Sequence, residues 1–182
     1  ESSGSTAEAA TGIKEVSSIR LFDLDGDGVR EIYIDGKDAN GQAITCAAFY
    51  SAGEAQPLHL ALFDSQSYAH GSIKDFADGK LVVDSEMNIL GTYKVKNVYA
   101  LADKSFSKAS DDIVFDNNMT YVTTLKSITL SNGSLLATGT KLRFTSTDGI
   151  SVINFVTDGG FTGSIPIASS GSGWTISGQP DT

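Results

Sequence analysis

Three aspartates, two glycines and a glutamate fall within nine residues near the start of the chain. In the stretch FDLDGDGVREIYI, residues 22–34, the acidic side chains are Asp23, Asp25, Asp27 and Glu31. Carboxylates spaced this closely repel one another strongly unless a cation lies between them. The chemistry that this window offers is therefore the binding of a hard cation through oxygen atoms.

The spacing of the acids favours calcium. With Asp23 as position one, acids stand at positions one, three, five and nine, and Gly28 stands at position six. Calcium takes six to eight oxygen ligands at ~2.3–2.6 Å in an adaptable cage. Gly26 and Gly28 allow the tight turn, and the carbonyl at position seven can add a ligand. We therefore predict a calcium site formed by Asp23, Asp25, Asp27, Val29 and Glu31.

Other ions and another loop type fit less well. Magnesium prefers fewer protein ligands, and zinc or iron would want histidine or cysteine, which are not near. A helix-loop-helix EF-hand needs a bidentate acid at position twelve, where this chain has Ile34. The flanking residues also alternate like strands. A solvated acidic hairpin without a metal is the remaining alternative.

A short loop closed by an acid at position nine, within a strand-loop-strand hairpin, fits both facts. It resembles the calcium loops of FG-GAP and integrin-type β-propeller repeats, and the DLDGDG loops of exported bacterial proteins. The resemblance covers about a dozen residues, and one copy cannot make a propeller, which needs at least four blades. It implies the loop and its ion only. We expect a structural role, since no nucleophile or base is adjacent.

The rest of the chain has the pattern of an all-β protein. Its 182 residues include 19 glycines and three prolines, and strict alternation appears in SIRLFDL, TYKVKNVYAL and KLRFTST. Asn-Gly and Asp-Gly pairs, which supply the positive φ of tight hairpins, begin at Asp35, Asn40, Asp78, Asn132, Asp148 and Asp158. Only the segment 64–78 is compatible with one short helix.

Two small β domains in tandem are predicted. Residues 1–12 form a flexible tether, 13–108 an antiparallel calcium-binding β domain, and 109–182 a second β domain. The polar stretch DKSFSKASDDIVFDNN breaks the alternation between residues 102 and 118 and indicates the connection. The tether is rich in Ser, Gly, Ala and Thr, a composition typical of residues that come after a removed targeting segment or a lipid-bearing residue. An arbitrary cloning boundary is the alternative.

The C-terminal part carries a second resemblance. LLATGTKL at residues 135–142 and GFTGSIPI at 160–167 have the pattern of a bacterial Src-homology-3-like barrel over about sixty residues. The resemblance implies a small barrel. The ligand grooves of that family are usually rich in aromatic residues, whereas Ser164 follows Thr162-Gly163 here. We expect Trp174, the only tryptophan, to pack in the core or along a terminal strand.

Composition limits the partners. A net charge of −9 argues against nucleic acids and anionic lipids. No segment approaches the ~18 apolar residues of a membrane-spanning helix, so a membrane is expected only through an N-terminal lipid anchor outside the chain. The single cysteine, Cys46, lies in the apolar run ITCAAFY and is expected to be buried.

No arrangement of residues indicates catalysis. His59 alternates with leucines in a predicted strand, His70 stands in a predicted loop, and no Gly-x-Ser-x-Gly elbow occurs. The combined pattern resembles exported, often lipid-anchored proteins of Gram-positive bacteria. We expect a non-enzymatic extracellular or cell-surface protein that binds an extracellular protein or a glycan. The alternative is an accessory or inhibitory domain of a cell-wall or carbohydrate hydrolase, or a degenerate hydrolase.

Overall fold

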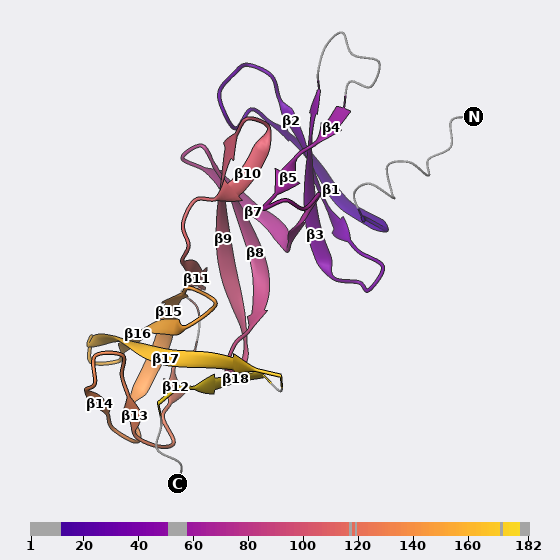
Figure 1. The fold of residues 1–182 in the computed structure, drawn as a ribbon. Coiled ribbons are helices and arrows are strands. Elements are labelled where there is room, and N and C mark those ends of the chain that lie inside the picture. The colour runs from indigo at the N-terminus through magenta and orange to yellow at the C-terminus, as the bar shows by residue number, and fades with distance from the viewer. Residues whose placement is uncertain (1–11, 51–57, 117, 119, 172, 179–182) are drawn as a thin grey trace. The chain divides into compact units, whose positions relative to one another are not determined.

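Strands make up all of the regular structure that the chain displays. The computed structural model describes residues 12–50, 58–116, 118, 120–171 and 173–178, so that residues 1–11 of the predicted tether lie outside the described residues (Figure 1). Within these ranges there is no helix, and none therefore that could cross a membrane. The all-β prediction is confirmed.

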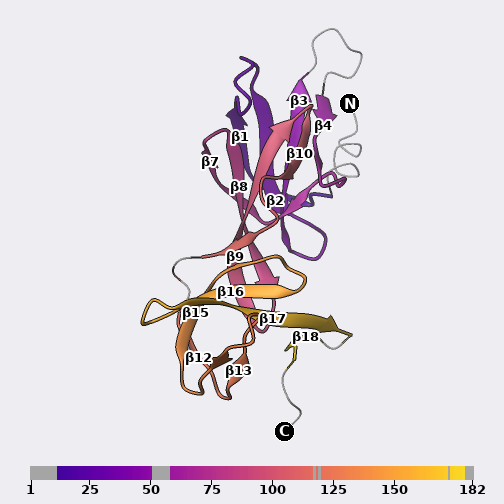
Figure 2. The ribbon, with the colours of Figure 1, turned by 60° about the vertical axis from the view of Figure 1, so that its left-hand side comes forward.

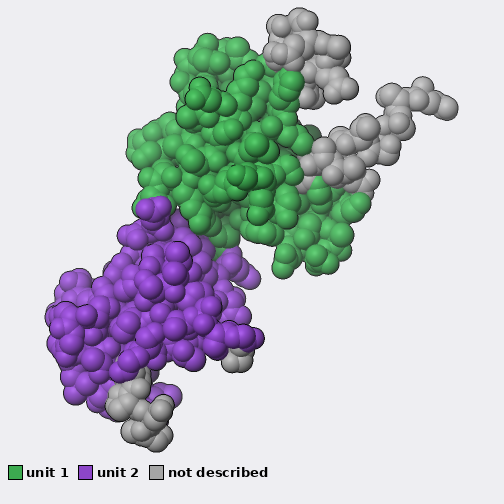
Figure 3. Space-filling view, viewed as in Figure 1, with its two compact units in different colours: residues 1–85, 97–110 green, residues 86–96, 111–182 purple. Residues whose placement is uncertain are grey.

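The chain divides into two compact units, coloured separately in Figure 3. The first unit comprises residues 1–85 and 97–110, and the second comprises 86–96 and 111–182. The sequence predicts one continuous segment for each domain, and those boundaries stay a prediction. In the structure the tip of one long hairpin, residues 86–96, groups with the C-terminal residues.

The first unit contains two sheets. One is an antiparallel sheet in the order β1-β2-β3-β4, with β6 also paired to β3; its strands are β1 (Glu15–Phe22), β2 (Glu31–Lys37), β3 (Ala43–Tyr50), β4 (Leu58–Leu60) and β6 (Ala69–His70). The other is part of the 11-stranded mixed sheet; it runs β5-β10-β9-β8-β7 and includes a parallel pair, β5 with β10. Its strands are β5 (Leu62–Phe63), β7 (Ser72–Ala77), β8 (Lys80–Asn88), β9 (Thr92–Ala102) and β10 (Ser105–Lys108), of which residues 86–96 belong to the second unit. Strands β8 and β9 form a long ribbon in Figure 1.

Side chains from both sheets form one core in the first unit. Tyr33 and Phe49 come from the five-stranded sheet, while Leu81, Tyr99 and Phe106 come from the other. Strand alternation produces this arrangement, because residues of one parity along each strand face the same side. The aromatic residues pack ring against ring, with Phe63 and Phe106 stacked at a centroid distance of 4.5 Å.

The opposite face of the five-stranded sheet has a smaller apolar cluster. It consists of Ile13, Ile44 and Cys46, with Ile34 and Tyr68 packed against it. Burial raises the pKa of the Cys46 thiol to about 12. Cys46 is therefore a small core residue and not a reactive thiol, as the sequence predicts.

A buried carboxylate ties the two sheets of the first unit together. Asp35 Oδ2 accepts hydrogen bonds from Arg20 Nη2 at 3.1 Å and Ser18 Oγ at 3.2 Å, both on β1. Its Oδ1 accepts from Thr45 Oγ1 at 2.6 Å, on β3, and from the Ile73 amide at 2.9 Å, on β7. One side chain thus joins three strands of one sheet to β7 of the other.

This position corrects the prediction of a hairpin turn at Asp35-Gly36. Both residues lie inside β2, paired with β1 and β3. Glycine is required at position 36 because a Cβ there would collide with the Glu15 carbonyl of β1. The dipeptide has the composition of a turn. In the structure, however, Asp35 is a buried hydrogen-bond acceptor, and Gly36 allows β1 to come close to β2.

The remaining Asn-Gly and Asp-Gly pairs do lie in turns between strands. They connect β2 to β3 and β7 to β8 in the first unit. In the second unit they connect strand 128–129 to 135–136, strand 141–147 to 152–157, and strand 152–157 to 162–170. The helix considered for residues 64–78 is wrong, since this segment contains β6 and β7. Ile73 and Phe76 have helical spacing, but β7 pairs with β8 through a bulge between Ile73 and Asp75.

The second unit is built around the order β18-β17-β16-β15-β11, of which β15 to β18 are labelled in Figure 2. β11 pairs with Val95 and Lys96 of β9. β12 pairs with β15, and β13 pairs with β14. The strands are β11 (Ile113–Phe115), β12 (Val122–Thr123), β13 (Ile128–Thr129), β14 (Leu135–Leu136), β15 (Lys141–Thr147), β16 (Val152–Thr157), β17 (Thr162–Ser170) and β18 (Gly173–Ile176). Among the described residues this path is open, without a pairing that closes a barrel.

The segment 102–118 is more structured than the sequence predicts. It contains β10 and β11, each paired with β9. Short strands of three or four residues show too few alternations to be recognised, and polar residues flank both. The pairing with β9 decides their conformation, so the stretch is not a simple connection.

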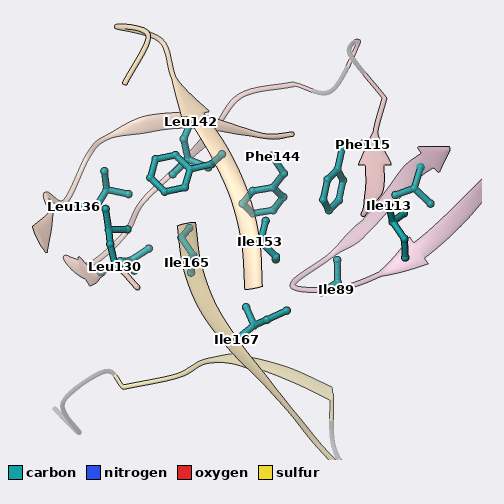
Figure 4. Packing of buried hydrophobic residues seen from close by; sticks show 13 residues of the cluster. Ile89, Ile113, Phe115, Leu130, Leu136, Leu142, Phe144, Ile153, Ile165 and Ile167 are labelled. Atoms are coloured by element: carbon teal, nitrogen blue, oxygen red, sulfur yellow. The ribbon is translucent and has the colours of Figure 1, made fainter. Parts of the chain in front are cut away.

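The second core is almost entirely aliphatic and aromatic. The rings of Phe144 and Phe115 lie close together in Figure 4, at a centroid distance of 5.4 Å, and Tyr93 contacts both. Gly163 is required on β17 because a Cβ there would lie 2.9 Å from Phe155 Cζ. Trp174 on β18 packs partly buried against this core, as predicted.

A well-bonded carboxylate forms the turn between β15 and β16. Asp148 accepts the amide protons of Ile150, Ser151 and Val152 and the hydroxyl proton of Ser151, at 2.6–3.0 Å. Burial opposes ionisation of Asp148, but these four hydrogen bonds outweigh it and lower its pKa. The ionised side chain holds the turn.

Replacing Asp35 with alanine should destabilise the first unit by about 3 kcal/mol or more, because buried donors on β1, β3 and β7 lose their common acceptor. Urea unfolding measures the loss. The control is Glu15→Ala, which removes an exposed ion pair with Lys37 at 3.7 Å and should cost less than about 1 kcal/mol. Equal losses in the two variants would contradict this role for Asp35.

Replacing Asp148 with alanine should destabilise the protein more at pH 7 than at pH 2. The pKa of Asp148 is lowered by folding, so its contribution is full above the unfolded pKa of about 3.9 and is lost as pH falls toward the folded value. Chemical unfolding at several pH values gives the difference. Asp158→Ala, in the next turn, is the matched control. A pH-independent difference for Asp148→Ala would show that its hydrogen bonds do not depend on the charge.

Candidate metal centre

The acidic loop connects two paired strands. Phe22, at the end of β1, is the register partner of Glu31, at the start of β2. Residues 23–30 form the loop between them, with Gly26 at φ 75° and Gly28 at φ 88°. This confirms the strand-loop-strand setting and the turn function of both glycines.

The loop brings the four acidic side chains together. One carboxylate oxygen from each of Asp23, Asp25, Asp27 and Glu31 lies within 4.8 Å of the others. This is the one cluster of three or more potential metal ligands found in the described part of the chain. The group could hold a metal ion, and its donors are all hard oxygens.

Hydrogen bonds from the loop backbone orient the aspartates. Both oxygens of Asp23 accept amide protons, from Gly26 at 2.8 Å and from Gly28 at 2.9 Å. Asp25 accepts from the Asp27 amide at 3.2 Å, and Asp27 accepts from the Val29 amide at 2.7 Å. Each oxygen has two lone pairs, so these bonds leave the carboxylates able to bind a cation.

Glu31 differs from the aspartates because it is buried, with 2% of its surface exposed. Its Oε2 accepts from the Leu24 amide at 2.9 Å and from the Tyr33 hydroxyl at 3.2 Å. Burial raises the pKa of Glu31; the two hydrogen bonds oppose this effect, while the charge of Asp25 adds to it. Burial and the adjacent charge of Glu31 raise the pKa of Tyr33, which therefore stays a neutral donor.

Tyr33 is a residue of the site that the sequence pattern did not single out. The signal was present, because Glu31 and Tyr33 are two residues apart on a predicted strand and must face the same side. What the sequence does not contain is the burial of that side, which results from the packing of the two sheets. The Tyr33 hydroxyl donates a hydrogen bond to Glu31 Oε2 and so orients the glutamate of the cluster.

Val29 is the predicted ligand that would bind the ion through its backbone carbonyl oxygen. Its side chain is exposed, and its amide donates to Asp27. Ligation by its carbonyl stays a prediction.

The two histidines lie far apart and do not form a common site. His59 on β4 is paired with Phe49, and His70 on β6 is paired with Ile44. These partners are five residues apart on β3, or roughly 17 Å at ~3.4 Å per residue, and their opposite parity places them on different faces of the sheet. His70 lies in a two-residue strand and not in the predicted loop; its ring contacts Tyr68.

Comparisons of the chain with models of known protein families, with curated proteins and with solved structures found no match. The function must therefore be inferred from the geometry of the residues themselves.

Neutralising one acid should stabilise the protein when divalent cations are removed. Asp25→Asn reduces the repulsion within the cluster and keeps an oxygen that can accept the Asp27 amide proton. We expect a higher unfolding midpoint than for the unmodified chain in EDTA, measured by thermal denaturation. Asp111→Asn, an exposed aspartate of the second unit, should leave the midpoint unchanged. A lower midpoint for Asp25→Asn in EDTA would show that repulsion among the carboxylates does not govern the stability of the metal-free loop.

Proposed function

We propose that the protein is a non-enzymatic extracellular or cell-envelope binding protein whose β1–β2 loop holds one structural calcium ion. The observation that supports this is the cluster of four carboxylates, one of them buried and bonded to Tyr33. A buried acid held by two donors at the base of an exposed acidic loop is suited to a cation that arrives from solvent. The ion would hold β1 and β2 together at the loop that connects them.

Calcium is the ion of choice because of its ligand chemistry. Asp23, Asp25, Asp27 and Glu31 supply only oxygen, and the Val29 carbonyl would supply another. Magnesium demands a stricter octahedron and keeps more of its water. Zinc and iron favour nitrogen and sulfur, which this cluster lacks.

The proposed ion supports the proposal of an extracellular location. Extracellular modules commonly bind calcium with Kd of ~10⁻⁴–10⁻³ M, which requires plentiful calcium. The charge of −9 favours protein or glycan partners over nucleic acid. The proposed attachment to a cell surface is an N-terminal lipid anchor.

We further propose that the second unit is a relative of bacterial Src-homology-3-like barrels. Successive antiparallel pairing of β15, β16 and β17 supports this, as does the close packing of Gly163 on Phe155. The hydrolase alternative receives no support from His59 and His70, because their register partners lie on opposite faces of β3.

Thermal unfolding with EDTA, with millimolar calcium and with millimolar magnesium tests the proposal. Calcium should raise the midpoint, with a stabilisation of ~2.7 kcal/mol at a concentration one hundred times Kd, and magnesium should have a much smaller effect. Asp23→Asn should abolish most of the calcium effect, while Asp111→Asn should retain it. If calcium leaves the midpoint of the unmodified chain unchanged, the loop is a solvated hairpin and the proposal fails.

A further inference from the structure

Strand β1 is an open edge of the five-stranded sheet. In the part of the chain that the structure describes, β1 pairs with β2 and with no other strand. An edge strand has a row of backbone N–H and C=O groups on its outer side, which can pair with another chain. β1 has eight residues. Its pairing with β2 has a bulge between Val16 and Ser18 and is regular from Ser18 to Phe22.

An aliphatic stripe follows this edge. Val16, Ile19 and Leu21 are 56%, 64% and 58% exposed. Their register partners on β2 are Gly36, Ile34 and Ile32, and the two isoleucines are half-buried. The stripe therefore continues from the edge onto the neighbouring strand, as a surface that an added strand would cover.

Apart from the bulge between Val16 and Ser18, the edge lacks the charged side chains that commonly protect an edge strand against pairing. Natural edge strands commonly carry outward charges, especially lysine. The one charged residue in the middle of β1, Arg20, is turned to the other face and is bonded to Asp35 at 3.1 Å. Glu15 lies at the end of the strand and pairs with Lys37. No charge interrupts the stripe.

Charge decides which kind of strand fits. Two copies of this chain would each bring a charge of −9. Antiparallel self-pairing centred on Ile19 would also place Glu15 opposite Asp23 of the other copy. The acidic loop follows β1 directly, and with one divalent ion its four carboxylates keep a net negative charge. A cationic strand suits this edge better than a second copy.

We propose that β1 is a docking edge for an extended segment of another protein, with alternating aliphatic residues and a lysine or arginine beside the acidic loop. The segment would add a strand to the five-stranded sheet and cover Val16, Ile19 and Leu21. Backbone hydrogen bonds would supply affinity, and the stripe and the loop would supply selectivity. This inference rests on the proposed function, because it names the partner class of the binding protein.

The probe is a synthetic octapeptide of alternating valine and threonine with lysine at both ends, and its matched control has glutamate at both ends. Each is titrated into ¹⁵N-labelled protein in millimolar calcium, with amide shifts and amide exchange as readouts. The lysine peptide should shift the amides of residues 15–22 and slow their exchange at least about tenfold. The glutamate peptide should bind at least about tenfold more weakly.

Ile19→Lys is the decisive variant, since the side chain is exposed and its replacement spares the core. This substitution should weaken binding of the lysine peptide at least about tenfold. The variant Ile150→Lys replaces an isoleucine of the second unit that is also exposed (74%). It should bind the lysine peptide as tightly as the unmodified chain does. Unchanged binding by Ile19→Lys, or equal binding of both peptides, would overturn the proposal.

Two further measurements separate the remaining outcomes. Sedimentation of the unmodified chain tests self-association; a dimer that Ile19→Lys dissociates would make a second copy the occupant and overturn our choice. The calcium-dependent midpoint of Ile19→Lys should equal that of the unmodified chain. Suppose that calcium stabilises both the unmodified chain and Ile19→Lys, but that neither peptide binds at about 1 mM, a concentration that would detect even weak binding. The docking-edge proposal then fails and the calcium proposal stands.

Discussion

A row of three buried polar side chains on β2 sets the structure of the first unit. Glu31, Tyr33 and Asp35 alternate along the strand, face the interior and are 2%, 0% and 4% exposed. Burying such groups is costly unless each finds partners. Glu31 is satisfied by the loop and by Tyr33, and Asp35 is satisfied by donors from β1, β3 and β7. Because the partners of Asp35 come from both sheets, its hydrogen bonds favour the observed packing of the two sheets.

The second unit follows a different principle. Its core consists of aliphatic and aromatic side chains, and the buried polar groups near it are threonines that bond to the local backbone or to turns. Such a core tolerates small rearrangements better than a network of buried charges. The specificity of this unit comes from turns such as the one that Asp148 holds, and from glycines at close crossings.

The polar row also connects the metal centre to the open edge. Glu31 forms the base of the acidic loop. Strand alternation places Arg20 on the face of Asp35, to which it bonds, and not on the face of Ile19 and Leu21. Because the charge of Arg20 is bonded to Asp35 on the interior face, no charged side chain lies between Val16, Ile19 and Leu21 on the exposed face. A cation in the loop would fix the end of β1 and with it the geometry of that edge, so that the proposed calcium site and the proposed docking edge would act as one surface.

The sequence by itself determines the all-β class, the positions of most hairpins and the acidic loop. These depend on local chemistry: alternation, positive φ at glycine, and carboxylates spaced for one cation. Tertiary structure alone decides that Asp35-Gly36 is strand and not turn, that Tyr33 supports Glu31, and that residues 86–96 belong to the second compact unit. It also decides that the short β10 and β11 exist. Each of these depends on partners distant in the chain, and no local pattern records which strands will meet.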